Sequence, residues 1–166
     1  MLRYAGIIYD SVVDGPGIRG VFFTQTCSHH CPGCHNPKTW DKDGGEILTQ
    51  DEFEKFMTYF EENEYANLTM SGGDPLDNLS TTNFVIREFK RRFPKRNIWL
   101  YTGYKIEDII KEDKYLEVLK LCNVVVDGPF IVSLRTSECP FRGSSNQRLI
   151  DIQKTFEKGE IILYEK

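Results

Sequence analysis

Short β-branched or aromatic runs alternate with helical segments along most of the chain. The predicted strands are 20–25, 67–70, 97–101 and 123–127. The predicted helices are 49–63, 81–93, 105–112 and 114–122. A chain that alternates strand and helix in this way predicts parallel β-α-β units with right-handed crossovers.

The helical period is clearest in the segment 49–63. One apolar face is formed by residues at i, i+3, i+4 and i+7, namely Phe53, Phe56, Met57 and Phe60. We expect Thr49 to cap this helix and Glu52 to complete a capping box. The apolar face is therefore expected to lie in the core.

The length of 166 residues indicates a single domain, 1–166. A closed eight-fold β/α barrel takes about 250 residues, so the chain predicts an α/β fold with an open or partial barrel of roughly four to six strands. At the end of the chain, "RLIDIQ" and "EIILYE" flank Lys158-Gly159 and predict a C-terminal hairpin.

Polar and glycine-rich groups follow all four predicted strands. They are Cys27 to Cys34, Ser71-Gly72-Gly73-Asp74, Thr102-Gly103 and Asp127-Gly128-Pro129. In parallel α/β folds the carboxyl ends of the strands form the rim where ligands bind. These four groups are therefore expected to converge on one site.

The composition argues against nucleic-acid binding, membrane insertion and secretion. The chain is 40% hydrophobic and 28% charged, and its net charge of −4 disfavours a general nucleic-acid partner. No stretch approaches the ~18 apolar residues of a membrane span. The first 17 residues lack the pattern of a secretory signal. We therefore expect a cytoplasmic protein without a membrane partner.

Five cysteines are an odd number, which favours reduced, metal-binding thiols over a disulfide framework. Three of them are clustered, namely Cys27, Cys31 and Cys34. A structural zinc ion would need a fourth ligand, which His29, His30 or His35 could supply. The alternative is a 4Fe–4S cluster held by three thiolates, with one iron left free to bind a ligand. Cys122 is expected to be buried packing, and Cys139 stands alone.

The spacing C-x3-C-x2-C resembles the signature of the radical S-adenosylmethionine enzymes. That superfamily usually has an aromatic residue before the third cysteine, whereas here Gly33 precedes it and His35 follows it. The segment 14–36 is similar to the N-terminal segment of the activating enzymes for glycyl-radical proteins. The segment 69–75 resembles their double-glycine-acid motif, with Asp74 in place of the commoner glutamate. The segments 99–104, 124–130 and 141–152 resemble the activating proteins of anaerobic ribonucleoside-triphosphate reductases.

This resemblance implies a partial β/α barrel of the radical S-adenosylmethionine type and two cofactors. The implied metal ligands are Cys27, Cys31 and Cys34, which would hold one 4Fe–4S cluster per chain. The implied contacts to S-adenosylmethionine are Gly33, His35, Gly72, Gly73, Asp74, Thr102 and Asp127. A 5′-deoxyadenosyl radical would take hydrogen from a glycine of the reductase large subunit, with a flavodoxin-type protein as electron donor. No side chain is expected to be catalytic beyond the cluster and its bound cofactor.

Several of these residues have a second interpretation. Thr102 could cap the following helix, and Asp127 could be an Asp-Gly-Pro turn residue. Arg19 and the loop before it are expected near the cysteines or near the incoming glycine. Arg142 and Arg148 either help to recognise the partner or lie in a connecting segment.

Two other functions remain open from the sequence. One is a radical S-adenosylmethionine enzyme that acts on a small molecule, and the other is a zinc-stabilised binding module without catalysis. A brown protein with about four irons and four sulfides per chain would distinguish the cluster from zinc. A glycine-centred radical on the reductase would distinguish the activase from a small-molecule enzyme.

Overall fold

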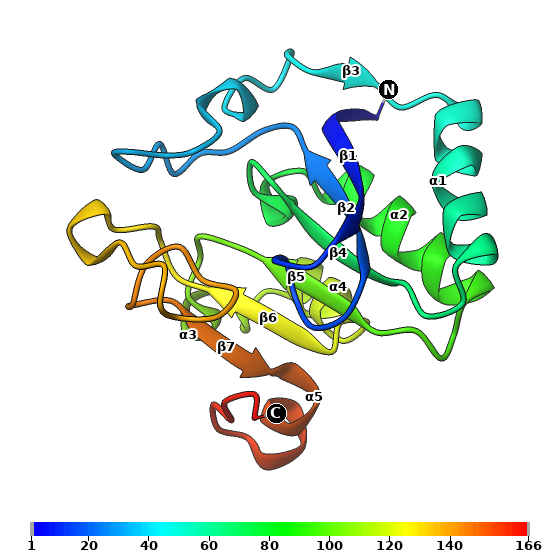
Figure 1. Ribbon diagram of the computed structural model, residues 1–166. Helices are drawn as coiled ribbons and strands as arrows, with labels where there is room; N and C mark the ends of the chain where they lie inside the picture. The colour runs from blue at the N-terminus through cyan, green and yellow to red at the C-terminus, as the bar shows by residue number, and fades with distance from the viewer. Residues whose placement is uncertain (1, 166) are drawn as a thin grey trace.

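Residues 2–165 of the computed structural model contain a seven-stranded sheet that stays open, with strand order β3-β1-β2-β4-β5-β6-β7 (Figure 1). The strands are β1 (Arg3–Ser11), β2 (Arg19–Thr24), β3 (Glu46–Ile47), β4 (Asn67–Gly72), β5 (Ile98–Tyr101), β6 (Val124–Asp127) and β7 (Arg148–Asp151). β2, β4, β5 and β6 run parallel, as predicted. β1, β3 and β7 pair antiparallel towards the two edges. The protein is therefore a mixed α/β fold with an unclosed sheet.

The α helices are α1 (Gln50–Glu62), α2 (Leu79–Arg92), α3 (Ile106–Ile109), α4 (Asp113–Leu119) and α5 (Ile152–Lys158). Short 3-10 helices are η1 (Pro37–Thr39), η2 (Pro75–Asp77) and η3 (Val132–Leu134). The Thr49 hydroxyl accepts the Glu52 amide at 3.1 Å, which confirms the predicted cap of α1. No helix within residues 2–165 is long and apolar enough to cross a membrane.

The main apolar core lies between the α helices and one face of the sheet. The predicted apolar face of α1 is fully buried there, and α2, α3, α4 and α5 also contribute buried side chains. Phe22, Leu68, Leu100 and Val125 face this core from the parallel strands. Because successive strand residues point to opposite faces, the residues between them point to the other side of the sheet.

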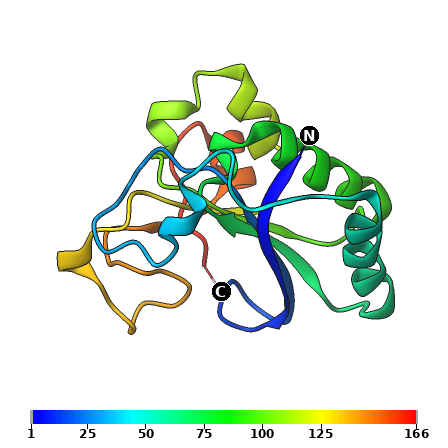
Figure 2. The same ribbon diagram turned by 90° about the horizontal axis from the view of Figure 1, so that it is seen from above.

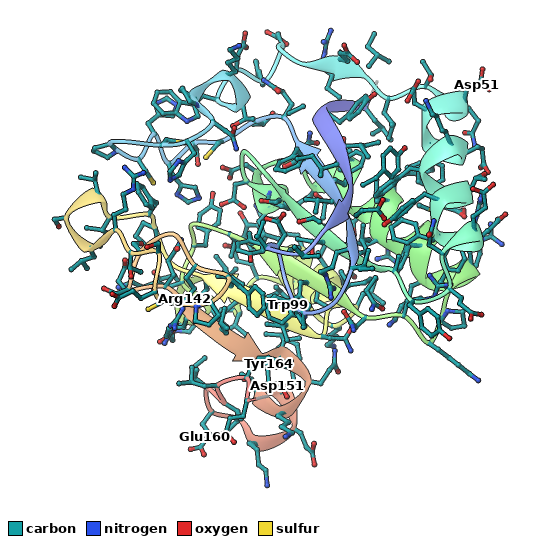
Figure 3. All side chains as sticks on the ribbon, viewed as in Figure 1. Asp51, Trp99, Arg142, Asp151, Glu160 and Tyr164 are labelled. Atoms are coloured by element: carbon teal, nitrogen blue, oxygen red, sulfur yellow. The ribbon has the colours of Figure 1, made fainter. Side chains whose placement is uncertain are left out.

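Within residues 2–165, connecting segments and the C-terminal tail cover the opposite face of the sheet. A second, smaller apolar cluster lies there around Trp99, Val124 and Val126. Trp99 and Tyr164 meet on this face, with ring centroids 5.2 Å apart (Figure 3). This face is therefore covered by loops and the C-terminal tail instead of helices.

Arg19 begins β2 and is buried on the same face as Trp99. Its guanidinium donates hydrogen bonds to Thr69 Oγ1 (2.7 Å), Leu68 O (2.8 Å), Asn97 Oδ1 (2.5 Å) and Pro16 O (3.0 Å). The cysteine segment leaves the other end of β2, roughly 17 Å further along the strand at about 3.3 Å per residue. The expectation that Arg19 lies near the cysteines is therefore wrong. Arg19 links β2 to β4, to Asn97 just before β5 and to the loop before β2.

The prediction of a C-terminal hairpin is wrong in its central part, where the chain forms the helix α5. Asp151 caps this helix by accepting the Lys154 amide at 3.1 Å, and Gly159 ends it with a φ of 73°. The chain then returns to β7 through an isolated bridge between Ile150 and Leu163. Lys158-Gly159 thus marks the end of a helix instead of a turn between two strands.

β1 and β3 were not predicted from the sequence. The register of β1 against β2 shifts between Tyr4 and Gly6 and again between Ile8 and Ser11. Such bulges interrupt the alternation of inward and outward side chains by which strands are recognised. β3 has only two residues, which is too short to show any period.

The burial of Arg19 predicts a structural role that a stability measurement can check. We expect Arg19→Met to lower the free energy of unfolding by about 3 kcal/mol, because it leaves buried acceptors without a donor. Arg87→Met is the matched control, since its side chain is 56% exposed and lies 3.7 Å from Glu117. Its effect should stay within about 0.5 kcal/mol in the same urea titration. Equal losses in the two variants would contradict this role of Arg19.

Candidate functional site

The chain leaving β2 carries the three clustered cysteines. Cys31-Pro32-Gly33-Cys34 forms a β-turn in which the Cys34 amide donates to the Cys31 carbonyl at 3.1 Å. Proline at the second position and Gly33, with a φ of 75°, at the third are typical of a type II turn. Because the ends of such a turn lie within about 7 Å, it brings Cys31 and Cys34 together.

This cysteine segment (residues 27–36) lies on the same side of the molecule as the segment after β6 that contains η3 (Figures 1 and 2). His35 meets Phe130 edge to face, with ring centroids 5.2 Å apart. A Cβ atom on Gly33 would lie 3.0 Å from the side chain of Val132. Gly33 thus fits because the two segments pack closely at this point.

One pocket at the carboxyl ends of the parallel strands collects most of the predicted site residues. Those that line it are Cys27, Cys31, Cys34, His35, Gly72, Gly73 and Thr102. Those that do not line it are Gly33, Asp74 and Asp127. Tyr101 and Phe130 also line the pocket but were not predicted. The expected convergence on one site is therefore confirmed for three of the four strand-end groups. It is confirmed only in part for the group at Asp127.

The glycine pair at the end of β4 is required by close packing against the backbone at the end of β2. A Cβ atom on Gly72, whose φ is 116°, would lie 2.3 Å from the Thr24 amide nitrogen. A Cβ atom on Gly73 would lie 2.4 Å from the Thr26 carbonyl oxygen. No side chain fits at either position, so the segment after β4 lies directly against the chain leaving β2.

The carboxylate of Asp74 is fully buried and is bonded within the protein. It accepts hydrogen bonds from Thr102 Oγ1 (3.0 Å to each oxygen), Gly103 N (2.9 Å), Leu76 N (3.0 Å) and His29 Nε2 (2.5 Å). The hydrogen bond to Asp74 raises the pKa of His29 above its usual value, although burial opposes this. Asp74 therefore joins three segments of the chain.

Thr102 and Asp127 have defined partners in the structure. The Thr102 hydroxyl donates to Asp74 and accepts the Tyr104 amide at 3.2 Å. Asp127 accepts the Ile106 amide at 2.9 Å, so the first amide of α3 is bonded by Asp127 and not by Thr102. The other bonds of Asp127 come from Arg148, at 3.0 and 2.6 Å. Asp127 thus connects β6, α3 and β7 beside the pocket.

The cysteines differ in their surroundings. Burial raises the pKa of Cys27 to about 11, although hydrogen bonds from the His29 and His30 backbone lower it. Burial raises the pKa of Cys122 to about 12, and this residue lies in the main core, as predicted. A thiol must lose its proton to bind a metal, so bound metal would stabilise the thiolate of Cys27 against this burial.

The donor set fits an iron–sulfur cluster. Three thiols line the pocket, and Cys122 and Cys139 are not among its lining residues. Thiolate sulfur is the usual ligand of such clusters, and three thiolates leave one iron of a 4Fe–4S cluster open. Ligand atoms of Cys27, His29 and Asp77 also lie within 4.8 Å of one another. Asp77 was not predicted, because its partner Ser28 is 49 positions away in the sequence.

Comparison with known proteins gives consistent matches over most of the chain. The family model of the 4Fe-4S single cluster domain matches residues 13–150. The anaerobic ribonucleoside-triphosphate reductase-activating protein of Enterobacteria phage T4 is 39% identical over 150 residues, covering 89% of this chain and 93% of its own. The proteins of the same name from Salmonella typhimurium and Escherichia coli K12 are each 33% identical, covering 88% and 82% of this chain and 96% and 90% of their own.

The contact between Gly103 and His29 gives a test of the packing at this site. A Cβ atom on Gly103 would lie 2.7 Å from the imidazole ring, so Gly103→Ala should lower the free energy of unfolding by about 2 kcal/mol. Gly6→Ala is the control, because its added Cβ would meet nothing within 4 Å. Urea denaturation of both variants measures the difference. A Gly103→Ala protein as stable as Gly6→Ala would contradict the observed packing.

Proposed function

The chain belongs to the family of anaerobic ribonucleoside-triphosphate reductase-activating proteins, and it matches the model of the 4Fe-4S single cluster domain. From this premise we propose that it is a radical S-adenosylmethionine activase. In this proposal it uses a 4Fe–4S cluster and S-adenosylmethionine to generate a 5′-deoxyadenosyl radical. That radical takes a hydrogen atom from a glycine of the reductase large subunit. The names of the relatives support the partner, and the family model supports the cluster.

The observation that carries the proposal is the shared pocket of the cysteines and the strand-end glycines. Cys27, Cys31 and Cys34 would hold the cluster on one wall. When bound, the cluster supplies one electron and an iron with an open coordination position. Gly72 and Gly73 line the same pocket, so a ligand bound to the cluster would meet their backbone.

The enclosure of Asp74 changes the expected mode of ligand binding. Its carboxylate already accepts bonds from two other segments of the chain and does not line the pocket. We assign the amino-acid part of S-adenosylmethionine to the exposed backbone at Gly72 and Gly73. Asp74 then acts by fixing that backbone. His35 and Phe130 provide the rings that the missing aromatic residue before Cys34 would otherwise supply.

A groove beside the pocket offers a path for the glycine of the reductase. It is lined by Val12, Val13, Asp14, Tyr101, Ser137 and 139–143. Tyr101 and Gly143 line both the groove and the pocket, so the two are neighbours. Val12 and Val13 are 65% and 71% exposed, and Arg142 lies on the connection between β6 and β7 (Figure 3). A polypeptide that covers these valines could bring a glycine to the pocket.

The open sheet suits a macromolecular substrate. We interpret the four parallel strands and their helices as the partial barrel of a single radical S-adenosylmethionine domain.

All five cysteines are free thiols, which supports a reducing compartment such as the cytoplasm. The proposed electron donor is a flavodoxin-type protein, and the net charge of −4 gives no support for a nucleic-acid partner.

The proposed function is tested by anaerobic reconstitution followed by incubation with the reductase, a reductant and S-adenosylmethionine. We expect about four irons and four sulfides per chain, and a glycine-centred radical on the reductase by electron paramagnetic resonance. Cys31→Ser should lose both iron and radical. Cys122→Ala, which removes a thiol from the core, should keep the iron content.

Other results would exclude the activase. A colourless protein with one zinc per chain would point to a binding module. A brown protein that cleaves S-adenosylmethionine but leaves no radical on the reductase would point to a small-molecule substrate.

The groove predicts a second, independent effect on partner binding. Val13→Asp should weaken binding to the reductase about tenfold, or roughly 1.4 kcal/mol, because a charge would be desolvated in the interface. Tyr65→Asp is the matched control, since Tyr65 is also an exposed apolar side chain, at 81%, but lies outside the groove. Calorimetric titration measures both affinities. Unchanged binding by Val13→Asp would remove the groove from the interface.

A further inference from the structure

The carboxylates of Asp74 and Asp77 both join the cysteine segment to the segment following β5. Asp77 accepts the Ser28 amide at 2.8 Å and the Ser28 hydroxyl at 2.9 Å. Its other oxygen accepts the Tyr104 hydroxyl at 2.5 Å. Asp74 repeats this arrangement with His29, as described above. We name the set the two-carboxylate clamp, which consists of Ser28, His29, Asp74, Asp77, Gly103 and Tyr104.

The imidazole of His29 is enclosed by the clamp. Its ring lies so close to Gly103 that a Cβ atom there would be 2.7 Å away. Tyr104 packs against it edge to face, with ring centroids 4.5 Å apart. The ring is therefore held by a hydrogen bond at one end and by contacts along its sides.

The rest of the cysteine segment is held differently. Within residues 2–165, the hydrogen bonds of residues 30–35 reach only near neighbours in the sequence, such as the His30 backbone to Cys27 and the Asn36 amide to Cys34 Sγ at 3.4 Å. Their internal bond is the Cys34 amide to the Cys31 carbonyl, and their outside contacts are packing contacts such as the stack of His30 on Trp40. The hydrogen bonds that anchor the segment are thus concentrated beside Cys27.

We propose that the two-carboxylate clamp holds Cys27 in position before any iron binds, whereas Cys31 and Cys34 become fixed only when metal binds. His29 is then a positioning residue that acts through Asp74. This inference rests on the proposed role of the three cysteines as iron ligands. The physical reason is that outer hydrogen bonds orient metal ligands, and a ligand that is already ordered costs less entropy to bind.

Alkylation of the metal-free protein tests the clamp. The protein is prepared without oxygen, with chelator and reductant, and treated with iodoacetamide, and the rate at each cysteine is followed by peptide mass spectrometry. We expect Cys27 to react about tenfold more slowly than Cys31 and Cys34. His29→Ala should bring the Cys27 rate close to theirs. His29→Gln, whose side-chain amide can still donate to Asp74, should restore the slow rate.

His30→Ala is the matched control, because this neighbouring histidine lies outside the clamp. Cys27 should remain slow in that variant. Circular dichroism checks that each variant is folded. If His29→Ala does not fold, Tyr104→Phe replaces it, since it removes one hydroxyl from Asp77 and should raise the Cys27 rate about threefold.

Three results would overturn the proposal. They are equal rates at all three cysteines in the unmodified protein, an equal effect of His29→Ala and His30→Ala, and no rescue by His29→Gln. The test contains no iron, S-adenosylmethionine or reductase. A failure to form the glycine radical would therefore refute the proposed function without changing these rates, and the two failures are distinguishable.

Discussion

The site depends on the in-register parallel pairing of β2, β4, β5 and β6. Thr24 pairs with Gly72, and Tyr101 pairs with Val126, so the carboxyl ends of the four strands lie side by side. Each segment that leaves these carboxyl ends meets the next one within a few residues. Cysteines, glycines and hydroxyl groups that are far apart in the sequence are consequently brought to one pocket.

Close backbone packing then decides which groups can face a ligand. Gly72 and Gly73 leave no space for a side chain, so the backbone itself forms that wall. Asp74, the next residue, turns its carboxylate away from the pocket and into the contact between the segments. Asp74 therefore shapes the site indirectly, by holding together the segments that line it. A carboxylate can be buried in this position only because hydrogen-bond donors surround it.

The features that were predictable from the sequence are those with a local signal. The parallel strands, the α1 cap and the cysteine cluster all depend on residues within a few positions of one another. The partners of Asp74 and Asp127 could not be predicted, because His29 lies 45 positions from Asp74 and Arg148 lies 21 positions from Asp127. The helix α5 was missed for another reason. Gly159 has the same positive φ at a helix end as glycine has in many hairpin turns, so its presence does not distinguish the two.

The two edges of the sheet are protected in different ways. At one edge the two residues of β3 pair only with Arg3 and Tyr4, so the rest of β1 lies at the edge, where its register shifts twice. At the other edge β7 has four residues, with Leu163 bridging to Ile150 beside it. An unpaired edge strand is a template on which another chain can add itself. Since β1 is interrupted by register shifts and the opposite edge is short and partly covered, neither edge offers a long regular template for another chain. One face of the sheet can therefore be covered only by loops without adding a regular edge for self-association.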